Sequence, residues 1–116
     1  MKRQAAEKRG RGAETIAAMW LRLFGWRILA RRARVHGGEV DIIARRGRIL
    51  AFIEVKARGT DQAAAFALDR YRLRRVAVAA EVLAQRYMRS GDDLRIDAMF
   101  IVPGRLPRHL PDVWQG

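Results

Sequence analysis

Two apolar stretches joined by a short turn constrain the fold of this chain more than any other feature. Residues 39–45 and 48–57 are rich in β-branched and apolar side chains, and a short turn around Arg46-Gly47 separates them. Two such runs around a glycine-containing turn predict a β-hairpin. Because successive side chains of a strand point to opposite faces, the hairpin also determines which of its polar residues can meet.

The predicted hairpin carries three carboxylates and one lysine among its apolar residues. Glu39 and Asp41 share one face of the first strand. Glu54 and Lys56 share one face of the second strand. Whether these two pairs meet depends on the register of the strands.

The register follows from the turn and from the hydrophobic pattern. We expect a two-residue turn at Arg46-Gly47, which places Asp41 opposite Phe52. In the same register Glu39 lies opposite Glu54, and Asp41 is a diagonal neighbour of Glu54, with Cβ atoms about 7 Å apart or somewhat less. A slip of one residue would mix polar and apolar side chains on each face, which disfavours it.

Carboxylates this close disfavour each other's ionisation, so the sheet gains no stability from them. A bound divalent cation would remove the conflict, and a ligand set made of oxygen atoms selects Mg²⁺, Mn²⁺ or Ca²⁺. The alternative is an exposed sheet edge at which Glu39 and Asp41 pair with some of the many arginines.

Lys56 is unusual because the chain otherwise uses arginine for positive charge. The sequence has 21 arginines and three lysines, and the other two lysines lie within the first ten residues. An ammonium group is compact and can change its protonation state, whereas a guanidinium cannot. We therefore interpret Lys56 as a residue that approaches a metal-bound water and a phosphate together.

The rest of the chain predicts helices and strands around the hairpin. Apolar residues at positions 13, 16, 17, 20, 21 and 24 have the spacing of an amphipathic helix, which Gly25 ends. Residues 26–34 and 94–102 are typical of strands, and residues 66–88 are typical of a second helix. The order α-β-β-β-α-β predicts an α/β fold with a mixed central sheet and flanking helices.

The length of 116 residues suits a single domain. We expect this domain at residues 11–103, after a flexible basic arm at residues 1–10 and before an irregular C-terminal tail at residues 104–116.

The charge of the chain predicts a polyanionic partner. With 24 lysines and arginines against 12 acidic residues, the formal net charge is +12, which favours nucleic acid over an anionic membrane surface. High arginine usage throughout a proteome is the alternative.

The chain has no cysteine, which excludes disulfides and thiolate metal sites. No stretch approaches the roughly 18 apolar residues of a membrane helix, so we expect a soluble, cytoplasmic protein.

Several short motifs carry a resemblance to a known family. Asp41 followed by Glu54-Val55-Lys56 resembles the PD-(D/E)XK nuclease signature, with Glu14 as the acid on a preceding helix. More narrowly, "GAE" at 12–14, "GEVDIIA" at 38–44, "FIEVKAR" at 52–58 and "RIDAMFIV" at 95–102 resemble the YraN family of small bacterial proteins. That family has a restriction-endonuclease-like fold, similar to archaeal Holliday junction resolvases.

The resemblance implies metal-dependent hydrolysis of phosphodiester bonds in DNA, with branched or recombination intermediates as candidate substrates. Asp41 and Glu54 would hold Mg²⁺ or Mn²⁺ together with the carbonyl of Val55 and waters. Lys56 would orient or activate a bound water. Glu14 would reach the metal through water, although an acid at the positive end of a helix is an equal alternative.

Other residues complete the predicted site. Glu39 is a candidate for contacting the metal ligands without binding the metal itself. The family often has a lysine early in its second long helix, where this chain has Arg72. We expect phosphate contacts from the following arginines: Arg58, Arg70, Arg72 and Arg74. Asp97 should pair with an arginine rather than bind metal, and His36 should be solvated.

Two further readings stay open. One is a nucleic-acid-binding accessory protein that keeps the fold and the charge but does not cut. The other is an accessory protein whose basic face binds RNA or another protein. By analogy with resolvases, a homodimer is the expected oligomeric state.

Overall fold

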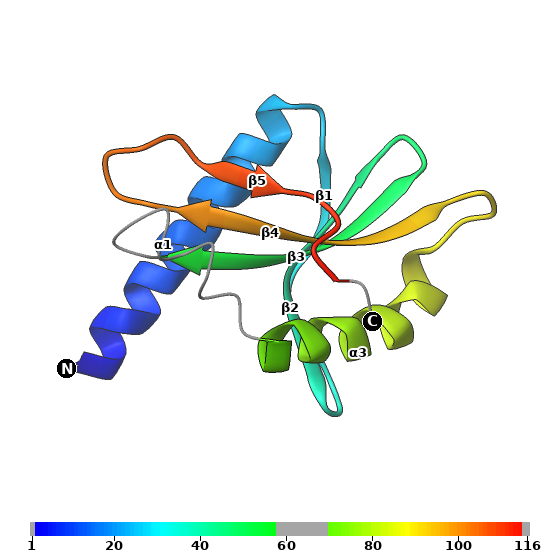
Figure 1. Ribbon diagram of the computed structural model, residues 1–116, viewed down its shortest axis with the longest axis horizontal. Helices are drawn as coiled ribbons and strands as arrows, with labels where there is room; N and C mark the ends of the chain where they lie inside the picture. Colours follow the sequence, from blue (N-terminus) through cyan, green and yellow to red (C-terminus); the bar gives the residue numbers. More distant parts are fainter. Residues whose placement is uncertain (1, 58–69, 115–116) are drawn as a thin grey trace.

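The computed structural model describes residues 2–57 and 70–114, and these residues fold as an α/β domain (Figure 1). Their elements follow the order α1 (Lys2–Leu23), β1 (Arg27–Val35), β2 (Gly38–Arg46), β3 (Ile49–Ala57), α3 (Arg70–Tyr87), β4 (Asp93–Ile101) and β5 (Arg108–Leu110). The predicted order of helices and strands is confirmed, with β5 as an additional short strand. The arrangement is compatible with the restriction-endonuclease-like fold.

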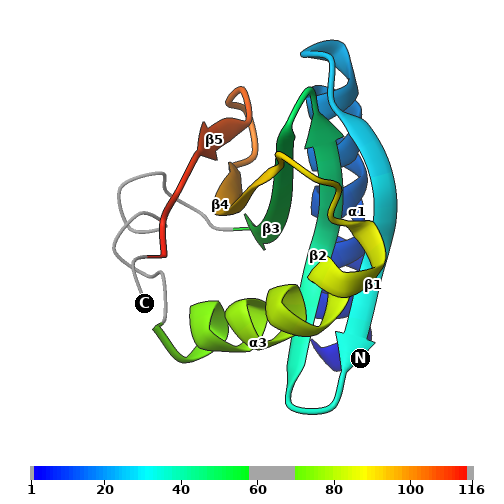
Figure 2. The same cartoon turned by 90° about the vertical axis from the view of Figure 1, so that its right-hand side faces the viewer.

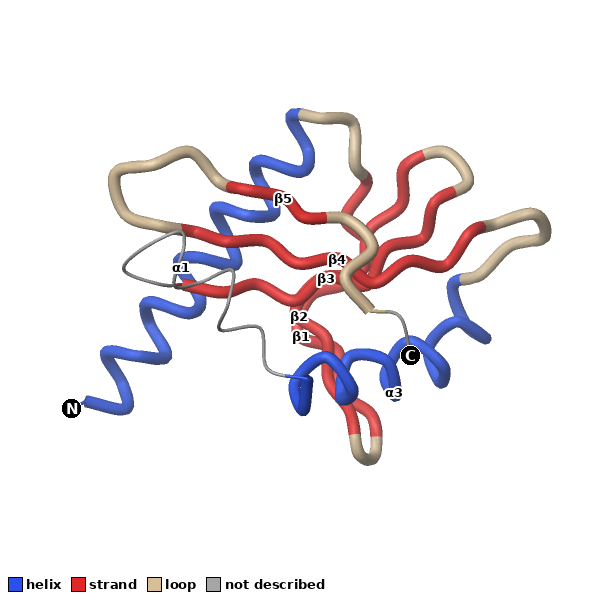
Figure 3. Tube along the Cα trace, viewed as in Figure 1, coloured by secondary structure: helices blue, strands red, loops and turns tan. Residues whose placement is uncertain are grey.

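The strands form one mixed sheet in the order β1-β2-β3-β4-β5 (Figure 3). Neighbouring strands are antiparallel except β3 and β4, which run parallel. A parallel pair needs a long crossover connection, and the chain between β3 and β4 passes through α3.

Two apolar clusters place α1 and α3 on opposite faces of the sheet (Figure 2). The cluster on the α1 side includes Ala17, Leu21, Ile42 and Ile53. The cluster on the α3 side includes Leu73, Val76, Ile43 and Phe52. Because the central strands are covered on both faces, their sequences are almost continuously apolar, and the polar residues within them are exceptions.

Gly38, the first residue of β2, allows α3 to pack closely on the sheet. A Cβ atom at this position would lie 2.5 Å from the carbonyl oxygen of Arg75 and 2.8 Å from the backbone nitrogen of Ala79. Since such contacts are too short for any real Cβ atom, only glycine lets β2 and α3 approach to this distance. The contact fixes the position of α3 beside the β1–β2 hairpin.

The turn between β2 and β3 differs from the prediction. Arg46 pairs with Ile49, so the two turn residues are Gly47 and Arg48, and the predicted turn at Arg46-Gly47 is wrong. Gly47 has a φ of 61°, and a positive φ at the first turn position fits the type II′ turn, which favours glycine there. The predicted turn would have put Arg46 at that position.

The corrected turn moves the register by two residues. Ile42 pairs with Ile53, so the next position brings Asp41 opposite Glu54 and not opposite Phe52. Within the paired residues 42–46 and 49–53, a shift of two residues preserves the alternation of side chains.

The first helix also begins earlier than predicted. It starts at Lys2, so residues 2–10 are helical, because most of them favour helix even without an apolar stripe. Whether this segment is flexible stays a prediction. Glu14 consequently lies in the interior of α1, and the alternative of an acid in the first helical turn is wrong.

Two further predictions concern the ends of elements. Within the tail that we expected to be irregular, Arg108–Leu110 pairs with β4 as β5. The start of the helix predicted at 66–88 and the predicted phosphate contact Arg58 lie outside the described residues.

Candidate active site

Strands β2 and β3 separate at Asp41. Their backbone pairing runs from Arg46–Ile49 to Ile42–Ile53 and then ends. At the next position the carboxylate of Asp41 accepts a hydrogen bond from the backbone N–H of Val55, with Oδ2 2.7 Å from the nitrogen. A side chain thus replaces the backbone partner, and this bond holds Asp41 in the fork between the two strands.

The side-chain alternation of β2 also breaks at Asp41. Ile42 packs in the cluster on the α1 side, and regular alternation would put Val40 there too. Val40 instead packs on the α3 side, together with Ile43. The side chains of β2 on either side of Asp41 therefore do not follow one regular alternation. Beyond this point the β1–β2 hairpin continues away from β3 towards α3 (Figure 1).

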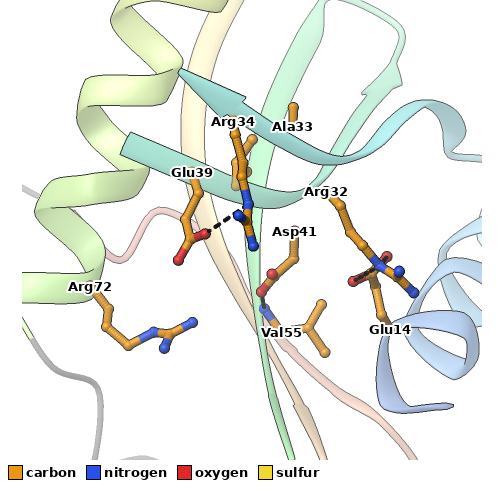
Figure 4. Close-up of a pocket in the computed structure, with 9 residues that line it drawn as sticks. Glu14, Arg32, Ala33, Arg34, Glu39, Asp41, Val55 and Arg72 are labelled. Carbon is orange, nitrogen blue, oxygen red and sulfur yellow. Dashed lines mark hydrogen bonds and ion pairs between the residues drawn. The ribbon is translucent and has the colours of Figure 1, made fainter. Parts of the chain in front are cut away.

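A cavity of about 260 Å³ lies at this fork (Figure 4). Its walls come from α1, β1, β2, β3 and α3, and they contain Glu14, Arg32, Ala33, Arg34, Glu39, Val40, Asp41, Val55 and Arg72. Three arginines and three carboxylates therefore surround one opening, a composition that suits an anionic ligand together with a cation.

Asp41 and Glu54 form a pair of like charges in the fork. Burial raises the pKa of Asp41 most strongly, and the neighbouring Glu54 raises it further, to about 7. The hydrogen bond from Val55 acts in the opposite direction without cancelling these effects. Glu54 is only 3% exposed. A perturbed carboxyl in a cavity, beside a second carboxylate, is typical of functional sites.

Arg72 of α3 supplies positive charge beside this acid pair. Its Nη2 atom lies 3.0 Å from Oε1 of Glu54, and about half of the Arg72 side chain is exposed. Arg72 therefore reaches an acid of the site directly, and its contact with phosphate stays a prediction.

Glu14 is buried on α1 and contacts two arginines of β1. The Nε atom of Arg31 lies 3.0 Å from Oε1, and the Nε atom of Arg32 lies 3.3 Å from both carboxylate oxygens. Glu14 is close enough to Asp41 for its charge to contribute to the raised pKa of Asp41. The structure thus brings Glu14 to the cavity, while its contact with a metal stays a prediction.

Glu39 lies on the cavity wall and is partly exposed. Its Oε2 atom is 3.6 Å from Nε of Arg34. Glu39 therefore pairs with an arginine, which was the alternative considered for it. A supporting role for Glu39 at a metal stays a prediction.

Lys56 lies two positions after Glu54 on β3 and is 7% exposed. Strand alternation places both side chains on the same face. Lys56 is not among the nine residues of the cavity wall. Its role in the site stays a prediction.

The other predicted residues are dispersed. Arg70 stacks on Trp114, with its guanidinium carbon 5.2 Å from the ring centre. Arg74 and His36 are exposed. Asp97 is fully buried and bonds Arg95 at 2.8 and 2.9 Å, which confirms its pairing with an arginine.

The chain can also be compared with known proteins. The uncharacterised protein family UPF0102 matches residues 13–101. This span includes both strands of the fork and the acids Glu14, Asp41 and Glu54. The chain belongs to the UPF0102 family. It is the YraN family that the sequence motifs indicated, so that prediction is confirmed.

Relatives in the UPF0102 family match this chain over nearly its full length. A UPF0102 protein of Sphingopyxis alaskensis is 62% identical, over 99% of this chain and 99% of its own length. One of Rhizorhabdus wittichii is 56% identical over 99% and 98%. One of Parvibaculum lavamentivorans is 51% identical over 96% of this chain and 84% of its own length. The family is uncharacterised, so these matches establish membership and give no activity.

The donor atoms of this UPF0102 site suit a hard divalent cation. Asp41 and Glu54 offer carboxylate oxygens, and Val55 offers a backbone carbonyl beside them. Mg²⁺ is commonly held by one or two carboxylates and keeps several waters, so two acids are sufficient. In residues 2–57 and 70–114 no group of three or more histidine, aspartate or glutamate residues is placed to enclose a metal.

The sequence does not single out Arg32 and Arg34 of the cavity wall. They belong to an arginine-rich strand whose outer face resembles a solvated surface. The signal that could have found them is their spacing, since alternate residues 32 and 34 pair across the hairpin with residues near 41 and 39. In the structure both side chains turn to the cavity from β1 (Figure 4).

Neither helix of the described residues combines the length and the apolar character that crossing a membrane would require.

Proposed function

We propose that this UPF0102 protein is a divalent-metal-dependent nuclease that hydrolyses phosphodiester bonds in DNA at the Asp41–Glu54 fork. The observation that carries the proposal is the acid pair itself. Two carboxylates are held together where the sheet opens, beside a cavity lined by arginines. This arrangement is unfavourable for a sheet alone and favourable for binding a cation next to a phosphate.

The residues of the chain would divide the work as follows. Asp41, oriented by the Val55 N–H, and Glu54, oriented by Arg72, would hold Mg²⁺ or Mn²⁺ with the Val55 carbonyl. The ion would supply a water of lowered pKa and stabilise charge on the phosphate. Lys56, on the same strand face as Glu54, would orient that water or move its proton.

The cavity arginines would hold the DNA backbone. Guanidinium groups bind phosphate oxygens through paired N–H donors, and the net charge of +12 attracts a polyanion from a distance. Branched DNA and recombination intermediates are the first substrates to test. We expect a homodimer that acts in the cytoplasm, since two copies could cut two strands.

A second candidate is a nucleic-acid-binding protein that does not cut. It is favoured by the ion pair between Arg72 and Glu54, because an arginine that neutralises a metal ligand could replace the metal. This candidate shares the cavity, the charge and the DNA partner with the first.

Cleavage of labelled branched, duplex and single-stranded DNA in millimolar Mg²⁺ or Mn²⁺ tests the proposal. Wild-type protein should cut at least one substrate, and Asp41→Asn should bind it without cutting. Glu81→Gln is a matched control, because Glu81 is an exposed acid of α3 that lies outside the cavity, and it should cut at nearly the wild-type rate. Binding without cleavage by wild type, on DNA and RNA, would favour the second candidate.

A further inference from the structure

Arg32 lies directly across the β1–β2 hairpin from Asp41. Arg31 pairs with Ile42, and Ala33 pairs with Val40, so the register brackets Arg32 and Asp41. Both residues lie on the cavity wall. The arginine therefore occupies the position on β1 closest in register to the principal acid of the site.

The backbone of Arg32 adopts a conformation that favours glycine. Its φ is 52°, in the left-handed region that side-chain-bearing residues occupy only at a cost in free energy. Glycine would adopt the same φ without strain. Strain at a non-glycine residue in a cavity motivates a functional explanation for its side chain.

The side chain of Arg32 is fixed at one edge and open at the other. Its Nε atom lies 3.3 Å from both oxygens of the buried Glu14 carboxylate. Its two terminal nitrogens make no hydrogen bond with the described residues, and 46% of the side chain is exposed. Glu14 thus orients the guanidinium through Nε on the α1 side of the cavity (Figure 4) and leaves its terminal donors available to a ligand.

Arg31 provides the contrast. Its Nε atom also bonds Glu14, but its Nη2 atom bonds the hydroxyl of Thr15 at 3.0 Å. Arg31 is not part of the cavity wall. The neighbours Arg31 and Arg32 therefore share one carboxylate, and of these two only Arg32 lines the cavity.

The other two arginines of the wall differ from Arg32. The side chain of Arg34 is 83% exposed, and its Nε atom lies 3.6 Å from the partly exposed Glu39, so no buried acid holds it. Arg72 uses a terminal nitrogen, Nη2, to pair with Glu54. We propose that Arg32 binds a phosphate oxygen of the nucleic-acid backbone in the cavity, and that Glu14 is the positioning residue which aims it. This inference rests on the proposed function and assigns its phosphate contact to one residue.

The test compares Arg32→Gly with Arg31→Ala. A fluorescent DNA duplex is titrated with each protein in EDTA, which prevents cleavage, and anisotropy is followed over a series of salt concentrations. Arg32→Gly should weaken binding about tenfold at low salt and reduce the salt slope by about one. Its melting temperature should stay near that of wild type, because relief of the backbone strain offsets the lost ion pair. Arg31→Ala should keep affinity within about twofold.

The outcomes separate this inference from the proposed function. If Arg32→Gly binds as wild type does, the assignment of Arg32 is overturned and the proposed function is unaffected. Equal losses in Arg32→Gly and Arg31→Ala would also overturn it, since charge alone would then explain binding. If wild type does not bind DNA at any salt concentration, both are overturned. Should Arg32→Gly fail to fold, Arg32→Lys gives the same comparison, with a several-fold loss expected because the fork is missing.

Discussion

Two groups of buried or partly buried carboxylates lie on the same sheet and behave in opposite ways. Asp97 on β4 is fully buried, but it accepts bonds from Arg95, from His109 at 2.7 Å and from the backbone N–H of Asp112 at 2.9 Å. Burial opposes its ionisation, yet these partners outweigh burial and hold the pKa of Asp97 below its usual value. At Asp41, burial and Glu54 raise the pKa to about 7.

The difference shows that burial alone does not decide the state of an acid in this fold. The fold can satisfy a buried carboxylate completely, as it does at Asp97, where Arg95 and His109 also pack around the ring of Trp26. At Asp41 the charged side chain with the largest effect is another acid, Glu54. We therefore interpret the Asp97 cluster as structural, and the Asp41–Glu54 pair as the candidate functional site.

The largest expected effect is loss of stability on substitution of Asp97. Asp97→Asn leaves Arg95 and His109 without their anionic partner inside the protein, and breaking a buried pair costs about 3–5 kcal/mol. The free energy of unfolding, measured by urea denaturation, should fall by this amount. A loss below about 1 kcal/mol would remove the distinction between the two groups of acids.

Lys56→Arg should change chemistry and leave stability nearly unchanged. A guanidinium is wider than an ammonium, and misplacing a bound water by about 1 Å can cost on the order of 100-fold in rate. DNA cleavage should therefore fall about 100-fold, while the melting temperature and DNA affinity stay close to wild type. Full cleavage by this variant would reduce Lys56 to a phosphate contact.

Metal binding should distinguish the Asp41–Glu54 pair from the Asp97 cluster directly. Millimolar Mn²⁺ should raise the melting temperature of wild type by mass action, equivalent to about 1–3 kcal/mol if the concentration exceeds the dissociation constant 10- to 100-fold. Asp41→Asn should abolish this shift. Asp97→Asn, although less stable, should keep it. An equal shift in wild type and Asp41→Asn would contradict a metal site at the fork.

The smallest expected effect concerns pH. Because the pKa of Asp41 is about 7 when folded and near 3.8 when unfolded, the folded state binds more protons between these values, and stability falls as pH rises through this window. Asp41→Asn removes this cost. Without metal, its advantage over wild type should grow from zero below pH 4 to about 1–2 kcal/mol at pH 8. This is less than the roughly 4 kcal/mol of the full pKa difference, because Asp41 is partly exposed to solvent. The contribution of Asp97 to stability depends on pH in the opposite direction. Its pKa is lowered in the folded protein, so the stability that it contributes is lost as pH falls below about 4. If the free energy of unfolding of Asp41→Asn and of wild type depended on pH in the same way, the pKa of Asp41 would not be raised in the folded protein.

The sequence by itself determined the hairpin, the α/β order and the family, because these depend on local patterns. The apolar runs at 39–45 and 48–57, the helical spacing from Ala13 and the signature around Glu54-Val55-Lys56 are all visible without coordinates. The sequence also predicted that Asp41 and Glu54 lie close enough to interact, and their charges do interact, although the regular strand pairing used for that prediction ends at Ile42 and Ile53.

The exact partners were decided only by the tertiary structure. The turn at Gly47–Arg48 moved Asp41 from Phe52 to Glu54, and a shift of two residues leaves no trace in the alternation. Likewise, α1 brings Glu14 to Arg32, α3 brings Arg72 to Glu54, and the tail brings His109 to Asp97. With 21 arginines in the chain, composition could not select which of them meets each acid. That selection depends on contacts between elements far apart in the sequence, which exist only once the sheet and its helices have packed.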